Sequence, residues 1–461
     1  MKNWQGTRIL VIGAARQGLA ITRYLLKQGA FVLLNDQKPA EELVHETQGF
    51  NHLNLQFAFG GHPITLLENI DLIIASGGVP LDIPIIQQAN EKGIPITNDS
   101  QIFMENVKAN TIGITGSAGK TTTTILVGEI AKIAVQKEHR VWVGGNIGTP
   151  LIEQLDEIKP NDLVVLELSS FQLDLISVSP HISAVLNITP NHLDRHVNMQ
   201  AYTQAKAHIL DFQSKDDFSI LNREDQGSWD LSPRVKGNLV TFGLKKPESD
   251  LPSTFLSSDN TLCLIESAKI MRIMPKSELR LKGEHNILNA LAACAIAYAA
   301  GFSIKAIRSG IGSVESIPHR LEFVRELKGV AWYNDSIATA PERSIAAIHS
   351  FQKPIILLLG GRDKNLPWQD LSKLVHERIK LLVIFGEAIE LISQAIGPIN
   401  DGDKLQDITK CNSLKEAVLT AAELAEAGDV VLLSPGGTSF DEFRDFEERG
   451  ESFKQWVQAM V

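Results

Sequence analysis

The stretch from Thr111 to Val127 constrains the fold of this chain more than any other part of its sequence. It reads TIGITGSAGKTTTTILV, in which a short apolar run meets a glycine-bearing turn and then a segment that can begin a helix. Gly116 and Gly119 permit the tight backbone of a phosphate-binding loop, whose N–H groups point at phosphate oxygens beside the positive end of a helix. The match is to T-G-S-x-G-K-T rather than to G-x-x-x-x-G-K-T, because five residues separate Gly113 from Gly119. Strand, loop and helix in this order predict a phosphate-loop nucleotide-binding domain with a mostly parallel sheet.

Two side chains of this loop are predicted to meet a nucleoside triphosphate and its metal ion. Lys120 would reach the β- and γ-phosphates, and the Thr121 hydroxyl would ligate Mg²⁺. Glu167 ends the apolar run LVVLE and stands where phosphate-loop proteins place a second acid near the metal. The alternative, that Glu167 is a solvated residue at the end of a strand, stays open at this point. The predicted ATP-binding residues of the loop are Gly116, Ser117, Ala118, Gly119, Lys120, Thr121 and Thr122.

Length, charge and cysteine content bound the class of protein. A chain of 461 residues exceeds one ordinary core, so two or three domains are expected. A net charge of −10 argues against a nucleic-acid surface but is compatible with small anionic ligands. Cys263, Cys294 and Cys411 are far apart, which favours buried thiols in a reducing compartment over disulfides or a metal site. Because no apolar run is long enough to span a bilayer, we expect a cytoplasmic protein without membrane insertion. We also expect the protein to be a monomer.

The first segment, residues 1–108, predicts a Rossmann-like domain. The apolar run at residues 8–12 leads into the turn at residues 13–18, which resembles G-x-G-x-x-G. Ala15 stands where the second glycine would let a pyrophosphate approach. A dinucleotide-dependent oxidoreductase is therefore an alternative that both Ala15 and the phosphate loop disfavour, and a turn that binds nothing is another. The turn at residues 76–80 follows a strand, where open α/β sheets bind ligands, so we expect a phosphate-bearing molecule on this domain.

Further polar motifs follow predicted strands along the rest of the chain. They are G-G-N-I-G at residues 144–148, L-E-L-S-S-F-Q-L at residues 166–173, N-I-T-x-x-H-L-D-R-H at residues 187–196 and Y-x-x-A-K at residues 202–206. From residue 318 onward, strands that end in glycine turns alternate with helices. This alternation predicts a second doubly wound sheet with ligands at its carboxyl edge.

These ordered motifs resemble those of the Mur ligase family, the ATP-dependent amide-forming enzymes of peptidoglycan precursor synthesis. The resemblance covers the whole chain and implies three domains. Residues 1–108 would bind a uridine nucleotide precursor, residues 109–317 would bind ATP, and residues 318–461 would form a C-terminal Rossmann-like domain that binds the amino acid and closes over the nucleotide.

The compact first domain and the run DEFRDFEERG at residues 441–450 resemble one branch of the family. That branch adds D-glutamate to UDP-N-acetylmuramoyl-L-alanine through an acyl phosphate, using ATP and Mg²⁺. Another Mur-type ligase or a folylpolyglutamate-type amide ligase is the alternative. Ile337 stands where the branch often has lysine, so Lys364 would face the amino-acid carboxylate alone, or a different contact would serve.

The resemblance also implies a modified residue. Lys206 occupies the family position of a carbamylated lysine, a carboxylate-like group that would hold a second Mg²⁺ together with His192. The implied catalytic residues are Lys120, His192 and Lys206. The implied metal ligands are Thr121, Glu167, His192 and Lys206. The further ATP-binding residues implied are Asn286, Asn289, His319, Arg320 and Asp335. The substrate-binding residues implied are Arg16, Gln17, Asp36, Gln37, Lys38, Ser76, Asn146, Ser169, Thr339, Lys364, Ser439 and Phe446.

Overall fold

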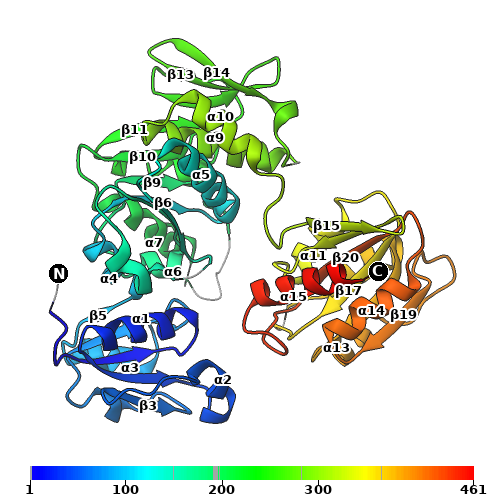
Figure 1. Ribbon diagram of the computed structural model, residues 1–461, viewed down its shortest axis with the longest axis horizontal. Coiled ribbons are helices and arrows are strands. Elements are labelled where there is room, and N and C mark those ends of the chain that lie inside the picture. Colours follow the sequence, from blue (N-terminus) through cyan, green and yellow to red (C-terminus); the bar gives the residue numbers. More distant parts are fainter. Residues whose placement is uncertain are drawn as a thin grey trace. The chain divides into compact units, whose positions relative to one another are not determined.

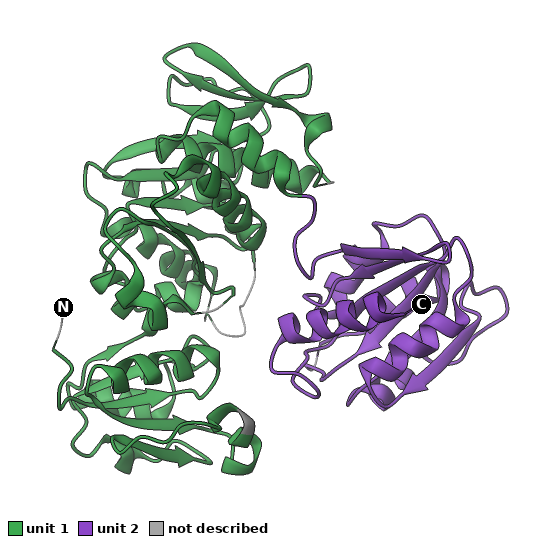
Figure 2. Cartoon of the chain, in the orientation of Figure 1, with its two compact units in different colours: residues 1–314 green, residues 315–461 purple. Residues whose placement is uncertain are grey.

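The computed structural model of the chain describes residues 3–148, 150–190, 196, 198–281, 283–364 and 366–460, with the backbone alone for His45. These residues form three α/β domains, each built on its own mostly parallel sheet (Figure 1). Contacts divide the chain into two compact units, Met1–Val314 and Glu315–Val461, and the first unit contains two of the sheets (Figure 2). Within the described ranges, no helix combines the length and apolar character needed to cross a membrane. The predicted α/β fold with three domains is confirmed.

The first sheet follows the predicted βαβ pattern. Its strands lie in the order β3-β2-β1-β4-β5 and pair in parallel. Helix α1 approaches the end of β1 so closely that a Cβ at Gly18 would lie 1.7 Å from the carbonyl oxygen of Gly13, so this position requires glycine. The strands are β1 (Arg8–Ile12), β2 (Phe31–Asp36), β3 (Leu55–Phe59), β4 (Leu72–Ala75) and β5 (Ile96–Thr97). The helices are α1 (Arg16–Lys27), α2 (Val44–Thr47) and α3 (Pro84–Glu91).

Helix α4 (Asp99–Asn106) leads from the first domain into the second. Asn98 caps this helix by accepting a hydrogen bond from the backbone N–H of Gln101 at 2.8 Å. The Nδ2 atom of Asn98 also donates to the carbonyl oxygen of Gln172 in the second domain at 2.7 Å. One hydrophobic cluster extends from Val11 of the first sheet to Leu166 of the second. The two domains of the first unit therefore share a packed core.

The second sheet carries the phosphate loop. Its strands lie in the order β14-β13-β12-β11-β10-β9-β6-β8-β7, and only the pairs β12–β13 and β13–β14 are antiparallel. The strands are β6 (Asn110–Thr115), β7 (Val141–Gly145), β8 (Leu163–Glu167), β9 (Ile182–Val185), β10 (Phe218–Asn222), β11 (Asn238–Phe242), β12 (Ser253–Leu256), β13 (Thr261–Glu266) and β14 (Lys269–Pro275). The helices are α5 (Lys120–Ala134), α6 (Ser170–Leu173), α7 (Met199–Asp211), α8 (Gln226–Trp229), α9 (Glu284–Ala299) and α10 (Ile304–Ser313).

The third sheet forms the core of the second unit. Its order is β15-β16-β20-β17-β18-β19, and all pairs except β15–β16 are parallel. Leu357 and Leu358 of β17 belong to two different hydrophobic clusters, so both faces of the sheet are covered. The strands are β15 (Glu322–Leu327), β16 (Val330–Asn334), β17 (Ile355–Gly360), β18 (Ile379–Phe385), β19 (Asp407–Cys411) and β20 (Val430–Gly436). The helices are α11 (Pro341–Ile348), α12 (Gln369–Arg378), α13 (Ile389–Ile396), α14 (Leu414–Leu424) and α15 (Phe446–Ala459).

The cysteines behave as expected from their spacing. Cys263, Cys294 and Cys411 are all free and buried. Burial raises the pKa of the Cys294 thiol far above its ordinary value, so this thiol stays protonated at neutral pH. The expectation of buried thiols is confirmed.

Candidate functional site

The phosphate loop joins the end of β6 to the start of α5, in the order that the sequence predicts. Gly119 has a φ of +82°, and a Cβ there would lie 2.3 Å from the Oδ1 atom of Asn289. Only glycine tolerates both this left-handed conformation and this close approach. Lys120 begins α5, so the loop runs into the positive end of the helix. This is the backbone arrangement in which helix N-termini bind phosphate.

The segment that follows β9 holds the loop from one side. The Ser117 hydroxyl donates to the carbonyl oxygen of Thr189 and accepts from its N–H, both at 2.9 Å, and lies 3.1 Å from the Tyr202 hydroxyl. The side-chain amide of Asn187 makes two hydrogen bonds to the backbone of Ala118. Sequence reasoning assigned no role to Asn187 or Tyr202, although both stand in the motifs. Asn187 follows β9, the strand beside β6, by two residues, and this position of a polar residue after an apolar strand is the signal that identifies it.

Two lysines converge on one carbonyl of the loop. The Nζ atom of Lys120 donates to the carbonyl oxygen of Gly116 at 2.9 Å, and the Nζ atom of Lys206 donates to the same oxygen at 3.0 Å. Lys206 is 1% exposed, and its Nζ atom lies 4.7 Å from the centre of the Tyr202 ring. Burial, with a smaller contribution from the Lys120 charge, lowers the pKa of Lys206 to about 6. At neutral pH the buried amine of Lys206 is therefore largely uncharged.

Glu167 lies beside the first turn of α5. Its Oε2 atom accepts a hydrogen bond from the Thr121 hydroxyl at 2.8 Å, and its Oε1 atom accepts from Nδ2 of Asn146 at 3.2 Å. Glu167 pairs with Ile114 across the parallel strands β8 and β6, so both strand ends meet at the same edge of the sheet. Glu167 is 2% exposed, which excludes the alternative of a solvated residue.

The oxygens of Thr121 and Glu167 fit a magnesium ion in their chemistry. Mg²⁺ prefers oxygen ligands and is usually held by one or two carboxylates together with phosphates and waters. Among the residues that the structure describes, no three His, Cys, Asp or Glu side chains form a group that could hold a metal by themselves. A magnesium ion here would therefore depend on the triphosphate for its remaining ligands. His192, the predicted partner of Lys206, lies outside the described residues.

The predicted adenine-side residues begin α9. Asn289 is buried, its Nδ2 atom donates to Oδ1 of Asn286 at 3.1 Å, and it contacts Gly119 of the loop. The structure thus brings this pair of asparagines to the phosphate loop. It also brings Lys120, Thr121, Asn146, Glu167 and Lys206 to the same sheet edge.

Three turns meet at the carboxyl edge of the first sheet. The carboxylate of Asp36 accepts hydrogen bonds from the N–H of Ala14 at 2.7 Å and of Lys38 at 2.9 Å. The Ser76 hydroxyl donates to the carbonyl oxygen of Gly13 at 3.2 Å. The predicted substrate residues of this domain therefore lie on adjacent turns. The remaining predicted substrate-binding residues near these turns lie at the start of α1 and directly after β2, and they are Arg16, Gln17 and Gln37.

Ser169 has a structural function that the sequence analysis did not anticipate. Its side chain accepts from the N–H of Gln172 at 3.3 Å, while Oε1 of Gln172 accepts from the N–H of Ser169 at 2.9 Å. This capping box begins the short helix α6. Gln172 also donates from Nε2 to the Ser100 hydroxyl at 2.9 Å, so the same turn is tied to α4.

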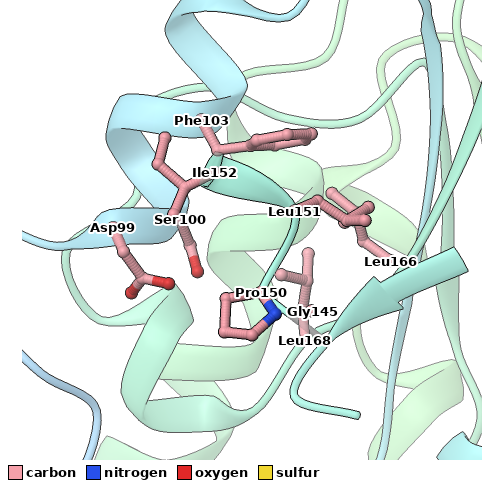
Figure 3. A pocket seen from close by; sticks show the side chains of 9 residues that line it. All are labelled: Asp99, Ser100, Phe103, Gly145, Pro150, Leu151, Ile152, Leu166 and Leu168. Atoms are coloured by element: carbon pink, nitrogen blue, oxygen red, sulfur yellow. The ribbon is translucent and has the colours of Figure 1, made fainter. Parts of the chain in front are cut away.

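Asp99 is a buried acid next to these segments. Figure 3 shows that Asp99 and Ser100 line a small cavity together with apolar side chains that include Leu151 and Leu166. Asp99 is 8% exposed, and its Oδ1 atom has no hydrogen-bond partner among the described residues. Burial raises the pKa of Asp99 to about 6.

The Asp99→Asn variant is expected to be more stable than the unchanged chain above pH 6. The pKa of Asp99 in the folded state, about 6, lies above the ordinary value of 3.8, so its contribution to stability is present below pH 3.8 and is lost as the pH rises through 6. Asparagine stays neutral, and the free energy of unfolding should rise by on the order of 1–3 kcal/mol at pH 8. Denaturant unfolding at pH 8 and at pH 4 measures the change in the free energy of unfolding, and Asp82→Asn, at an exposed position, is the control. An equal effect at both pH values would contradict it.

The four predicted substrate-binding residues of the second unit lie in the segments that follow β16, β17 and β20. The Nζ atom of Lys364 lies 3.5 Å from the Thr339 hydroxyl. The ring of Phe446, at the start of α15, contacts the ring of His319 edge to face, with centroids 6.1 Å apart. Ser439 is buried in the loop after β20. Lys364 and Thr339 are thus neighbours, as are Phe446 and His319.

Asp335 is held inside this unit. Its carboxylate accepts from the Ser434 hydroxyl at 2.8 Å and from the N–H of Leu321, the residue after Arg320, at 3.1 Å. Burial raises the pKa of Asp335 to about 7. His319 has a φ of +61° and donates its N–H to Glu322 at 2.8 Å. His319 and Arg320 therefore directly precede Leu321, the residue bonded to Asp335, and all three predicted residues belong to the second unit. Asn286 and Asn289 belong to the first unit.

Comparisons with known proteins give a consistent result. Three family models match in order: "Mur ligase MurD-like, N-terminal domain" at residues 7–98, "Mur ligase middle domain" at residues 114–297, and "Mur ligase, glutamate ligase domain" at residues 319–437. The chain is 38% identical to the UDP-N-acetylmuramoylalanine--D-glutamate ligase of Symbiobacterium thermophilum, over 98% of each chain. It is 36% identical to the ligase of the same name from Pelotomaculum thermopropionicum, over 100% of this chain and 99% of the relative.

Solved structures share the fold. The UDP-N-acetylmuramate-alanine ligase MurC of Thermotoga maritima has a TM-score of 0.58 at 19% identity, with 98% of this chain and 99% of that chain covered. The MurF ligase of Thermotoga maritima in complex with ADP has a TM-score of 0.53 at 17% identity, with 98% of this chain and 95% of that chain covered. Because the family models cover most of the chain in sequence order and the curated relatives match its full length, this chain belongs to the Mur ligase family.

Proposed function

We propose that this chain joins the alanine carboxylate of UDP-N-acetylmuramoyl-L-alanine to the amine of D-glutamate, with ATP converted to ADP and phosphate. Curated relatives of that name match the whole chain at 36–38% identity. The observation that carries the chemistry is the sheet edge at which Lys120, Thr121, Glu167 and Lys206 meet around the phosphate loop. A carboxylate and an amine do not condense in water without activation, and a phosphoryl-transfer site of this kind supplies the activation.

The residues of the loop stabilise phosphoryl transfer from ATP to the substrate carboxylate. Charge develops on the oxygens of the transferred phosphoryl group, and the Lys120 ammonium, together with the backbone N–H groups at the start of α5, would neutralise it. Thr121 and Glu167 would hold Mg²⁺, which would supply further positive charge to stabilise the transfer. The resulting acyl phosphate is then open to attack by the amine of the amino acid.

Lys206 is proposed to act as a carbamate. Only the neutral amine adds carbon dioxide, and its nitrogen lies in a buried site that favours the neutral form. The carbamate has the anionic oxygens that a second magnesium ion requires and that an ammonium group lacks. His192 is its proposed partner on the basis of the family pattern.

The substrates are proposed to divide between the outer domains. Residues 1–108 would bind the uridine nucleotide precursor at the three adjoining turns that contain Asp36 and Ser76. Residues 109–317 would bind ATP. Residues 318–461 would bind D-glutamate where Lys364 lies beside Thr339, because the lysine is a cation that suits a carboxylate.

A panel of amino acids tests the proposed function. The full chain would be supplied with ATP, Mg²⁺ and UDP-N-acetylmuramoyl-L-alanine, and phosphate release would be measured with each amino acid in turn. Release is expected with D-glutamate and is expected to disappear when a chelator removes the metal. Release with a different amino acid alone would overturn the D-glutamate assignment. Reduction of a nicotinamide cofactor without phosphate release would overturn the ligase assignment altogether.

A further inference from the structure

Asn187 extends the pairing of β6 and β9 past the end of the sheet and into the phosphate loop. The N–H of Leu186 donates to the carbonyl oxygen of Thr115 at 2.9 Å, and the N–H of Ser117 donates to the carbonyl oxygen of Asn187 at 3.0 Å. The next N–H, that of Ala118, donates to the side-chain Oδ1 atom of Asn187 at 2.8 Å. Asn187 thus accepts two consecutive N–H groups of the loop, one with its backbone carbonyl and one with its side chain.

The same side chain also orients the following peptide. The Nδ2 atom of Asn187 donates to the carbonyl oxygen of Ala118 at 3.0 Å. In a trans peptide the N–H points opposite to the C=O, so the N–H of Gly119 points away from Asn187. This contact also keeps a carbonyl dipole, whose negative end would repel phosphate, turned toward the asparagine. The donor and acceptor of one planar amide together set two consecutive peptide units.

We propose that Asn187 is a positioning residue of the phosphate loop. Asn187 accepts the hydrogen bonds of the Ser117 and Ala118 N–H groups, and it thereby directs the N–H of Gly119 and the start of α5 to the triphosphate. The inference rests on the proposed use of ATP. The N–H groups that bind phosphate would then be those of Gly119 and of the first residues of α5, where the helix dipole and the N–H groups act together.

Only asparagine supplies both groups at this distance. Aspartate keeps the acceptor for the Ala118 N–H but places an anionic oxygen against the Ala118 carbonyl, in a loop that is proposed to bind phosphate. Alanine removes both contacts without adding charge. Glutamine keeps both groups on a stem that is longer by one methylene. The three variants therefore separate lost contacts from added repulsion.

Nucleotide affinity is the decisive measurement. The Kd of the full chain for ATP with Mg²⁺ would be measured by calorimetry, and kcat and KM by phosphate release. Asn187→Asp is expected to raise the Kd by about tenfold or more, because it loses a hydrogen bond and adds repulsion. Asn187→Ala and Asn187→Gln are expected to raise it by about threefold to tenfold. The KM for the uridine precursor should stay unchanged.

Asn222→Asp is the matched control. Asn222 is buried, whereas Asn187 is partly exposed. Asn222 ends the neighbouring strand β10 and donates from Nδ2 to the carbonyl oxygen of Leu186 at 3.1 Å, a residue outside the phosphate loop. Its variant is expected to lose thermal stability while keeping the ATP Kd.

Two results would overturn the inference. If the Asn187 variants lose thermal stability but bind ATP as tightly as the unchanged chain, Asn187 has a structural function only, and the proposed function stands. If the unchanged chain itself binds no ATP, the proposed function and this inference fail together. Asn187→Gln keeps the test decisive if the aspartate variant does not fold.

Discussion

Lys120→Ala is expected to lower the rate of ATP-dependent phosphate release by about 10²–10³-fold while the protein remains folded. The Nζ atom of Lys120 donates to the carbonyl oxygens of Gly116 at 2.9 Å and Ser117 at 3.4 Å, so its charge lies beside the backbone of the phosphate loop. A positive charge fixed where negative charge develops needs no reorganisation during the reaction, and alanine removes it. Phosphate release at saturating ATP, together with a thermal melt, measures both parts of the prediction.

Lys132→Ala provides the control for this variant. Lys132 lies on the same helix, is exposed, and pairs with Glu129 at 2.6 Å. Its loss should leave the rate unchanged, because an exposed pair far from the loop contributes little. Near-normal turnover in Lys120→Ala with an unchanged melting temperature would show that the phosphate-loop assignment is wrong.

Lys206→Ala is expected to be nearly inactive, and acetate or formate is expected to restore part of its activity. If Lys206 acts as a carbamate, the variant lacks an anionic oxygen ligand, and a small carboxylate that diffuses into the space can replace it. The loss should be about a hundredfold or more, comparable with removal of other charged groups from phosphoryl-transfer sites. Phosphate release is measured with increasing acetate or formate at constant ionic strength.

Lys206→Arg separates the carbamate from a simple positive charge. Arginine places a permanently protonated cation near the carbonyl oxygen of Gly116 and does not form the carbamate. The arginine variant should therefore be as inactive as the alanine variant. Activity in Lys206→Arg would contradict the carbamate and favour a role for the charge. Inactivity of Lys206→Ala without rescue by any carboxylate would leave the carbamate unsupported.

The phosphate loop was predictable because everything that defines it is contiguous. The buried run of β6, the glycine that adopts a φ of +82° and the lysine that begins α5 follow one another within a few residues. Glu167 was predictable for a related reason. It ends a fully apolar run, and parallel strands that are buried on both faces end at a common edge.

Other features of the site depend on contacts that no local pattern reports. The carbonyl oxygen of Gly116 accepts from a lysine 90 residues further along the chain. Asn98 and Ser100 were not singled out, yet they tie the first domain to the turn that Ser169 begins. The capping box of Ser169 is a function in addition to its predicted contact with substrate, and the sequence Ser-Ser-Phe-Gln already contains the signal for it.

The amino-acid order alone determined the three α/β domains, the loop between β6 and α5 and the acid at the end of β8, because hydrophobic patterning and glycine positions act on neighbouring residues. Folding was needed to place Asn187 against Ala118, to bury the amine of Lys206 and to bury Asp99 so that its Oδ1 atom has no hydrogen-bond partner among the described residues. Those outcomes depend on strand order, on register and on how completely packed elements exclude water. Burial sets the pKa of a side chain, and burial is a property of the whole fold.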